Sequence, residues 1–227
     1  MAGMKGFYIA LAGIAVAGAA ALVVMANRGG GSVPIGPIPP EAIEAARDFP
    51  GYVDGSADAP VEIIEYADFQ CPACQHFWLL TVRDIKERLV KTGRVRYIFR
   101  DFPLPMHDKS RVAHHAAACA DEQGMFWPMH DTLFQTQNRW SGAKGTGEPQ
   151  FRDMAEGLGL DLARYDDCMA AGRYRGRIQA SYDSGVSLGV SSTPTYIIGN
   201  SLYNGMSYDE VKAIVDSLSR EAGATSP

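Results

Sequence analysis

VEIIEYADFQCPACQHFWLL, residues 61–80, places the cysteines Cys71 and Cys74 between two apolar patterns of different period. The β-branched run Val61–Tyr66 before them predicts a buried strand. After them, apolar residues recur at helical spacing as far as Leu89, which predicts a helix. The cysteines therefore lie where a strand ends and a helix begins.

Cys71 is expected at or next to the helix N-cap, with Pro72 in the first helical position, where its missing N–H costs nothing. The Cys71 sulfur then faces the free N–H groups of Ala73 and Cys74 and the positive end of the helix dipole. Both effects favour the thiolate, which is the nucleophile in thiol chemistry. Cys74 follows within reach for a disulfide and is expected to be the more buried partner. The pair is therefore predicted to exchange disulfides.

Two other uses of a Cys-x-x-Cys pair remain open from the residues alone. A zinc site needs a second ligand pair nearby, whereas Cys119 and Cys168 stand far apart and alone. A purely structural disulfide inside one helical turn is the second alternative. The position at a strand-to-helix junction favours a reactive pair over both, and we expect no metal site.

Length and charge narrow the class of protein. The 227 residues leave about one ordinary domain once the N-terminal segment is set aside. The formal net charge is −5 and the sequence contains no basic run. A nucleic-acid partner is therefore not expected.

The N-terminal segment, residues 1–28, contains the uncharged apolar run Gly6–Ala26. A run of about 20 such residues suits a membrane span, so we expect a retained anchor helix. The alternative is a cleaved signal peptide, with Val24-Met25-Ala26 as the cleavage site. Both interpretations place the remainder outside the cytoplasm, periplasmic or at the cell surface, where disulfides persist.

The chain after the anchor divides into recognisable stretches. Residues 29–49 are rich in Gly and Pro and predict a tether. Arg94–Arg100 alternates polar with apolar side chains and predicts a second strand. Asp108–Tyr182 is mostly helical in pattern, and Thr193–Asn200 predicts a turn followed by a strand. Tyr208–Arg220 predicts an amphipathic helix that closes the domain.

Glu65 stands six residues before Cys71 in an otherwise apolar strand. One interpretation is an exposed acid on the polar face of the strand. The other is a partly buried carboxylate beneath the dithiol, which accepts a proton from Cys74. Strand alternation fits both interpretations equally.

Four histidines, His76, His107, His114 and His115, are candidates for a functional role. His107, His114 and His115 could share a helical face, but no metal-binding motif accompanies them. We expect these three to be solvent-exposed or capping residues. His76 lies two residues past Cys74 and could either tune the dithiol or face water.

Cys119 and Cys168 are predicted to form a structural disulfide. They are the only other cysteines, both fall in helical patterns, and the expected compartment is oxidising. Two buried free thiols remain the alternative, since connectivity is not determined by sequence alone.

Motifs on both sides of the junction form a specific combination. They are DFQCPAC at 68–74 with its upstream acid, CADEQGMFW at 119–127, GVSSTPT at 189–195 and GN at 199–200. With them, the chain resembles the DsbA-like branch of the thioredoxin superfamily over about residues 50–220. The resemblance implies an α/β thioredoxin fold over residues 50–222, interrupted by a helical insertion at about residues 104–189.

The resemblance also implies roles for individual residues. The Thr193–Pro194 bond is expected to be cis and packed against the dithiol, with the Thr193 backbone pairing with an extended substrate chain. Glu65 is expected to be the buried acid. Pro72-Ala73 stands where the best-known oxidases carry Pro-His, so we expect a less extreme oxidising strength.

Together these points predict a membrane-anchored, extracytoplasmic thiol–disulfide oxidoreductase that uses Cys71 and Cys74 and needs no cofactor. Its expected substrates are exported cysteine-containing proteins, which receive disulfides from it. The family resemblance implies a membrane quinone-linked partner that reoxidises the pair. The alternatives are a reductase or isomerase using the same cysteines, and a non-catalytic thioredoxin-like binding module.

Overall fold

The structure is a computed structural model that describes residues 34–37 and 51–224, with side chains over residues 51–221. The anchor expected over Gly6–Ala26 lies outside these residues. Within the described part of the chain, every helix is too short or too polar to cross a membrane.

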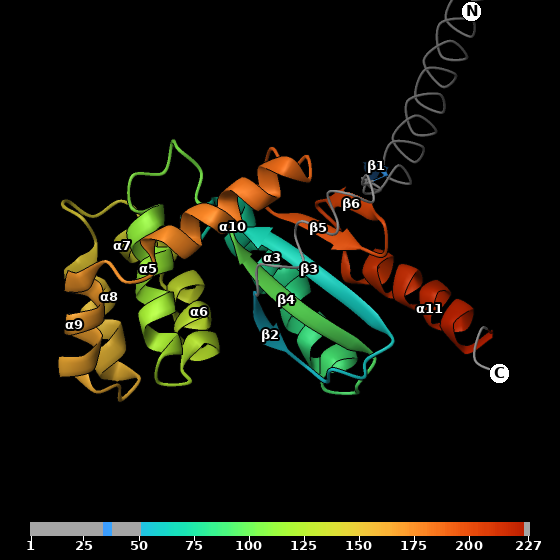
Figure 1. Ribbon diagram of the computed structural model, residues 1–227, viewed down its shortest axis with the longest axis horizontal. Coiled ribbons are helices and arrows are strands. Elements are labelled where there is room, and N and C mark those ends of the chain that lie inside the picture. The colour runs from blue at the N-terminus through green and yellow to red at the C-terminus, as the bar shows by residue number, and fades with distance from the viewer. Residues whose placement is uncertain (1–33, 38–50, 225–227) are drawn as a thin grey trace, which may run out of the picture. The chain divides into compact units, whose positions relative to one another are not determined.

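The sheet has six strands in the order β1-β6-β5-β3-β4-β2 (Figure 1). Strands β3 and β4 run parallel, and every other neighbouring pair is antiparallel. The strand expected at Val61–Tyr66 is thus the centre of the sheet. The strands are β1 (Pro34–Pro37), β2 (Tyr52–Asp54), β3 (Val61–Ala67), β4 (Val95–Asp101), β5 (Thr195–Ile198) and β6 (Ser201–Asn204).

Strand β4 differs from the alternating strand that its sequence predicts. All its residues are buried except Arg96, which is half-buried. The reason is its position between β3 and β2, where helices cover the sheet on both faces. Polar side chains such as Arg100 therefore point into the protein and not into water.

The redox helix starts directly after Cys71 and continues to Val90. Two of its turns are π-helical, but the chain does not leave the helix between them. The helix predicted as far as Leu89 is confirmed. Its consecutive segments are α3 (Pro72–Phe77), η1 (Trp78–Val82), α4 (Arg83–Ile85) and η2 (Lys86–Val90).

A helical insertion separates β4 from β5 and lies beside the sheet (Figure 1). After β6 comes helix α11 (Tyr208–Ala224), which packs on β3 and the redox helix. The insertion contains α5 (Ser110–Asp121), α6 (Phe126–Gln135), α7 (Gln137–Trp140), α8 (Glu148–Gly157), α9 (Leu162–Ala171) and α10 (Arg175–Ser187).

Part of the expected tether belongs to the sheet. Pro34–Pro37 forms strand β1 and pairs antiparallel with β6, with an irregular register between Pro34 and Gly36. Proline removes a backbone donor, so it is tolerated on an edge strand such as this one. Four residues of the predicted Gly/Pro-rich linker, residues 29–49, thus form an edge strand, which the sequence pattern did not indicate.

Two apolar clusters hold the faces of the sheet. The larger one joins the face that carries Ile63 and Ala67 to the redox helix, α11 and the insertion. The smaller one contains Tyr66 and Phe102 on the opposite face, because successive strand residues point to opposite sides. Gly185 of α10 lies against this second cluster, and a Cβ there would stand only 2.7 Å from the Phe102 ring. Glycine lets α10 approach the sheet closely.

Candidate active site

Cys71 occupies the N-cap of α3, as its place before Pro72 predicts. Its backbone is extended, with φ −74° and ψ 121°, and its side chain makes no capping hydrogen bond of regular geometry. Both cysteines are free thiols in the structure. Cys71 is 7% exposed whereas Cys74 is 0% exposed, so Cys71 is the sulfur that another molecule reaches first.

The two thiols have opposite pKa shifts. The pKa of Cys71 is lowered to about 6, chiefly because the Cys74 thiol donates to its sulfur. The backbone N–H groups of Cys74 and Ala73 add to this effect, while burial opposes it. Burial raises the pKa of Cys74 well above its ordinary value, and the neighbouring Cys71 sulfur raises it further. At neutral pH the pair is therefore a Cys71 thiolate supported by a Cys74 thiol.

Thr193 faces this pair from the turn before β5. The Thr193–Pro194 bond is cis, as the resemblance implies. In its thiol form Cys71 donates to the Thr193 carbonyl oxygen at 3.6 Å. The Thr193 hydroxyl makes no regular hydrogen bond within the described residues, yet it helps to lower the pKa of both sulfurs. A chain that paired with the Thr193 backbone would thus lie directly against Cys71.

Glu65 is buried, so the interpretation of an exposed strand acid is wrong. Its side chain is 1% exposed and lies on the sheet face that the redox helix covers. The Tyr97 hydroxyl donates to Glu65 Oε2 at 2.5 Å, and the Tyr196 hydroxyl donates to Oε1 at 3.1 Å. Burial outweighs these two bonds and raises the pKa of Glu65 to about 7.

The two tyrosines connect Glu65 to the dithiol region. Tyr97 comes from β4 and Tyr196 from β5, and both are fully buried. Burial raises the pKa of each hydroxyl, and the charges of Glu65 and Cys74 raise it further. Each tyrosine is thus close enough to interact electrostatically with both Glu65 and Cys74. Within the described residues, Glu65 is hydrogen-bonded to the two tyrosines and not to Cys74. No role had been predicted for either tyrosine.

The insertion also supports the cysteine loop from the side. Gln137 of α7 donates from Nε2 to the carbonyl oxygens of Phe69 at 2.8 Å and Cys71 at 2.9 Å. Gln137 is buried and lies 66 residues from Cys71 in sequence. Nothing in the sequence around Gln137 indicates this contact, which requires the fold to bring α7 to the active site.

His114 and His115 are buried, contrary to the expectation of solvent-exposed or capping residues, whereas His107 is half-buried and His76 is exposed. His114 is 0% exposed and its Nδ1 lies 2.6 Å from Asp101 Oδ1. His115 is also buried. Helix α5 packs against α6, α8, α9 and α10, so both histidines point into the protein. The Ala-rich sequence of this helix is the feature that indicates such close packing.

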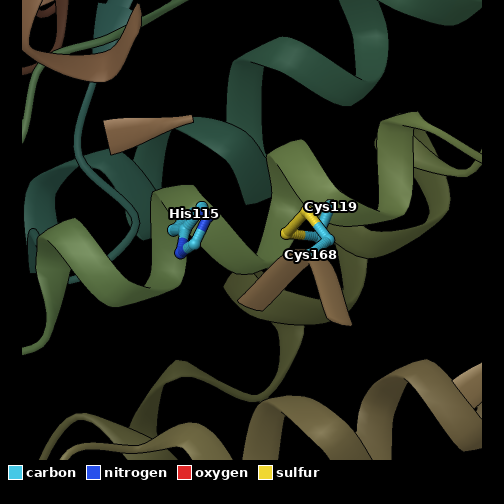
Figure 2. A group of neighbouring side chains, drawn as sticks. All are labelled: His115, Cys119 and Cys168. Atoms are coloured by element: carbon cyan, nitrogen blue, oxygen red, sulfur yellow. A yellow bond between two sulfur atoms is a disulfide. The ribbon is translucent and has the colours of Figure 1, made fainter. Parts of the chain in front are cut away.

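Cys119 of α5 and Cys168 of α9 are joined by a disulfide, with an S–S distance of 2.04 Å. The alternative of two free thiols is therefore wrong in this structure. Figure 2 shows His115 on the same helix as Cys119, beside the disulfide. The ligand-type atoms of His115 and the two cysteines lie within 4.8 Å of one another. Because each sulfur is bonded to the other, neither offers the thiolate that binds metal.

A family model described as thioredoxin matches residues 49–217 of the chain. The chain belongs to the thioredoxin family. Its structure is similar to α-DsbA1 from Wolbachia pipientis, with a TM-score of 0.71 and 20% identity, over 79% of this chain and 98% of that one. Oxidised BdbD from Bacillus subtilis has a TM-score of 0.68 and 20% identity, over 84% and 99%. These likenesses show a thioredoxin fold with a helical insertion.

Two curated relatives of this chain belong to different kinds of protein. It is 37% identical over 155 residues to the Na(+)/H(+) antiporter NhaA 3 of Salinispora tropica. The aligned region covers 68% of this chain and 22% of the antiporter. It is 26% identical over 164 residues to the probable disulfide bond formation protein D of Bacillus anthracis, and this region covers 71% of this chain and 75% of that protein. The chain thus spans less than a quarter of the antiporter's length.

Proposed function

We propose that this chain is a thiol–disulfide oxidoreductase that introduces disulfides into exported proteins through Cys71 and Cys74. The observation that carries the proposal is the opposite shift of the two cysteines, with the pKa of Cys71 near 6 and that of Cys74 well above its ordinary value. A thiolate that leaves easily and a buried partner that protonates readily are what disulfide exchange requires.

The reaction begins with the Cys71–Cys74 disulfide. A substrate thiolate attacks Cys71 Sγ, the Cys71–Cys74 bond breaks, and its electron pair goes to Cys74. A second substrate thiolate then attacks the substrate sulfur bound to Cys71. This step forms the substrate disulfide and releases Cys71 as a thiolate, which its low pKa favours. Glu65, with a pKa near 7, is suited to supply or accept the proton of Cys74 through its tyrosine neighbours.

The Thr193 backbone is proposed to hold the substrate during these steps. An extended substrate segment can pair with the backbone beside Pro194 by strand addition. The carbonyl of Thr193 lies 3.6 Å from Cys71 Sγ, so the paired segment would carry its cysteine to the Cys71 sulfur. Recognition through backbone groups suits an enzyme that handles many different exported proteins.

The location follows from the N-terminal sequence. We propose that Gly6–Ala26 anchors the chain and that the catalytic domain acts outside the cytoplasm, where a quinone-linked membrane partner reoxidises it. The uncharged length of this run supports an anchor. The Cys119–Cys168 disulfide is typical of an oxidising compartment. N-terminal sequencing of the mature protein tests the anchor, and a mature chain that begins at Asn27 would contradict it.

Trapping experiments test the roles of the two cysteines. Cys74→Ser keeps the attacked sulfur but removes its partner, so mixed disulfides with cysteine-containing proteins should accumulate on a non-reducing gel. Cys71→Ser should form none, because Cys74 is fully buried. If Cys71→Ser traps proteins and Cys74→Ser does not, the assigned roles are reversed.

The net direction is tested by the reduction potential of the pair. Stabilisation of the Cys71 thiolate favours the reduced enzyme and hence an oxidase, so we expect a potential above the value of about −270 mV of thioredoxin. Equilibration with glutathione, followed by alkylation, measures it. A potential at or below that value supports the reductase or isomerase alternative. A chain that neither reduces insulin nor oxidises a dithiol peptide would support the alternative of a non-catalytic binding module.

A further inference from the structure

Asp68 lies between β3 and α3, and its backbone contacts both cysteines. Its N–H donates to Cys74 Sγ at 3.5 Å. Its carbonyl oxygen accepts from the Cys71 N–H at 3.0 Å. The residue is 0% exposed, so the position of its backbone is set by the protein around it and not by solvent.

The Asp68 carboxylate is held by donors on both oxygens. Oδ1 accepts from the Gln70 N–H at 2.8 Å and from the Ser110 hydroxyl at 2.5 Å. Oδ2 accepts from the Leu104 N–H at 2.8 Å and lies 2.6 Å from His107 Nδ1. A carboxylate only accepts hydrogen bonds, so His107 is assigned as the donor. Three of these four donors belong to residues 104–110, so the carboxylate ties the cysteine loop to the start of the insertion.

A second aspartate–histidine pair in the chain serves as a comparison. Asp101 and His114 are both buried, and their Oδ1 and Nδ1 atoms also lie 2.6 Å apart. Asp101 ends strand β4, and its side chain makes no hydrogen bond to either cysteine within the described residues. Burial of a carboxylate is costly, and both aspartates offset the cost with hydrogen bonds. Of the two aspartates, Asp68 is the one whose backbone contacts the cysteines.

We propose that Asp68 is a positioning residue of the redox pair, whose clamped carboxylate fixes the backbone N–H that stabilises negative charge on Cys74. The inference rests on the proposed function. When a substrate thiolate attacks Cys71, the electron pair of the broken disulfide moves to Cys74 Sγ, where the Asp68 N–H donates to it. In the reverse step the Cys74 thiolate attacks Cys71 and the substrate sulfur leaves as a thiolate. The same N–H therefore accelerates exchange in both directions.

Exchange with glutathione measures this effect on the full chain. Asp68→Asn keeps the shape of the side chain but places an amide N–H₂ group against backbone or hydroxyl donors. We expect formation and breakdown of the Cys71–glutathione mixed disulfide to slow about tenfold, the size of one lost hydrogen bond to a charged group. The pH midpoint of the breakdown step, which reports Cys74, should move upward.

The direction of this shift separates positioning from simple charge. Removal of the Asp68 negative charge alone would make a Cys74 thiolate easier to form and would move the midpoint downward. Ser110→Ala keeps the charge and removes one donor from Oδ1, so it should also slow exchange, by a few-fold. If Asp68→Asn does not fold, Ser110→Ala decides the question.

Asp101→Asn is the matched control. It disturbs a buried aspartate that is likewise paired with a histidine, and it should leave the exchange rates and the pH midpoint unchanged. Three outcomes would each overturn this inference and leave the proposed function standing. They are equal effects in Asp101→Asn and Asp68→Asn, unchanged rates in Asp68→Asn, and a downward shift of the pH midpoint in Asp68→Asn. A wild-type chain that does not exchange with glutathione would overturn the proposed function and this inference together.

Discussion

The two cysteine pairs of this chain have the same chemistry but different surroundings. Cys71 and Cys74 lie three residues apart at the start of a helix, with one sulfur partly exposed. Cys119 and Cys168 lie 49 residues apart in sequence, join two helices, and are both buried. The first pair is free in the structure and the second is a disulfide.

The difference shows what makes a pair reactive. Around Cys71 there are helix N–H groups, the Cys74 thiol donor and the Thr193 hydroxyl, all of which lower the pKa of Cys71 and so stabilise its thiolate. The Cys119–Cys168 bond has no such access, because neither sulfur reaches solvent. A closed loop of this length restricts the unfolded chain, so the second pair contributes to stability and the first to exchange.

Removal of each pair should therefore affect a different property. We expect Cys71→Ala with Cys74→Ala to abolish exchange while changing the free energy of unfolding by only about 1 kcal/mol. We expect Cys119→Ala with Cys168→Ala to retain exchange in the folded protein. The loop closed by that disulfide, with a separation of 49 residues, predicts a loss of about 4 kcal/mol in stability.

Two measurements on the same four proteins decide this comparison. Reduction of a fluorescent model disulfide reports exchange, and urea unfolding of oxidised wild-type and variant chains reports stability. The wild-type protein and a Cys119→Ser single variant serve as references. If the Cys119/Cys168 double variant loses exchange at urea concentrations where it is still folded, the second pair also takes part in the chemistry.

The sequence indicates the local features of the active site but not its distant contacts. The strand, the helix and the N-cap position of Cys71 follow from residues within one short stretch, because propensity and hydrophobic period act locally. Glu65 is bonded to Tyr97 and Tyr196, which stand 32 and 131 residues away. Strand alternation could not decide whether Glu65 was buried, because β3 is central and covered on both faces. Such contacts depend on sheet register, which one strand does not reveal.

A buried acid beneath the reactive pair should make stability fall as pH rises. The pKa of Glu65 is raised from 4.5 to about 7, so between these values the folded chain holds a proton that the unfolded chain has lost. The free energy of unfolding then decreases as pH rises from 4.5 to 7. The loss reaches about 3 kcal/mol once the pH exceeds 7. Glu65→Gln should remove this dependence.

Urea unfolding of wild-type and Glu65→Gln chains from pH 4 to pH 8 measures the effect. A constant difference between the two proteins reflects the loss of the tyrosine hydrogen bonds, whereas a difference that changes with pH reflects the proton on Glu65. Parallel curves across this range would mean that Glu65 has the same pKa in the folded and unfolded chains, so that the fold does not hold a proton on it above pH 4.5.

The smallest expected effect concerns His115 beside the structural disulfide, and its sign is opposite. Burial, assisted by the positive charges of Arg175 and Arg177 and opposed by Glu122, lowers the pKa of His115 below 6.5. As pH falls through 6.5, the unfolded chain takes up a proton that the folded chain does not, so stability falls on the acid side. His115→Gln should lessen this acid loss and leave the curve above pH 7 parallel to that of the wild type. Because Glu65 makes stability fall as pH rises and His115 makes it fall as pH drops, the opposite signs of the two variants test whether the cysteine pairs lie in electrostatically different surroundings. A His115→Gln curve that stays parallel to the wild type down to pH 4 would show that the imidazole beside the disulfide is protonated in the folded chain as readily as in the unfolded one.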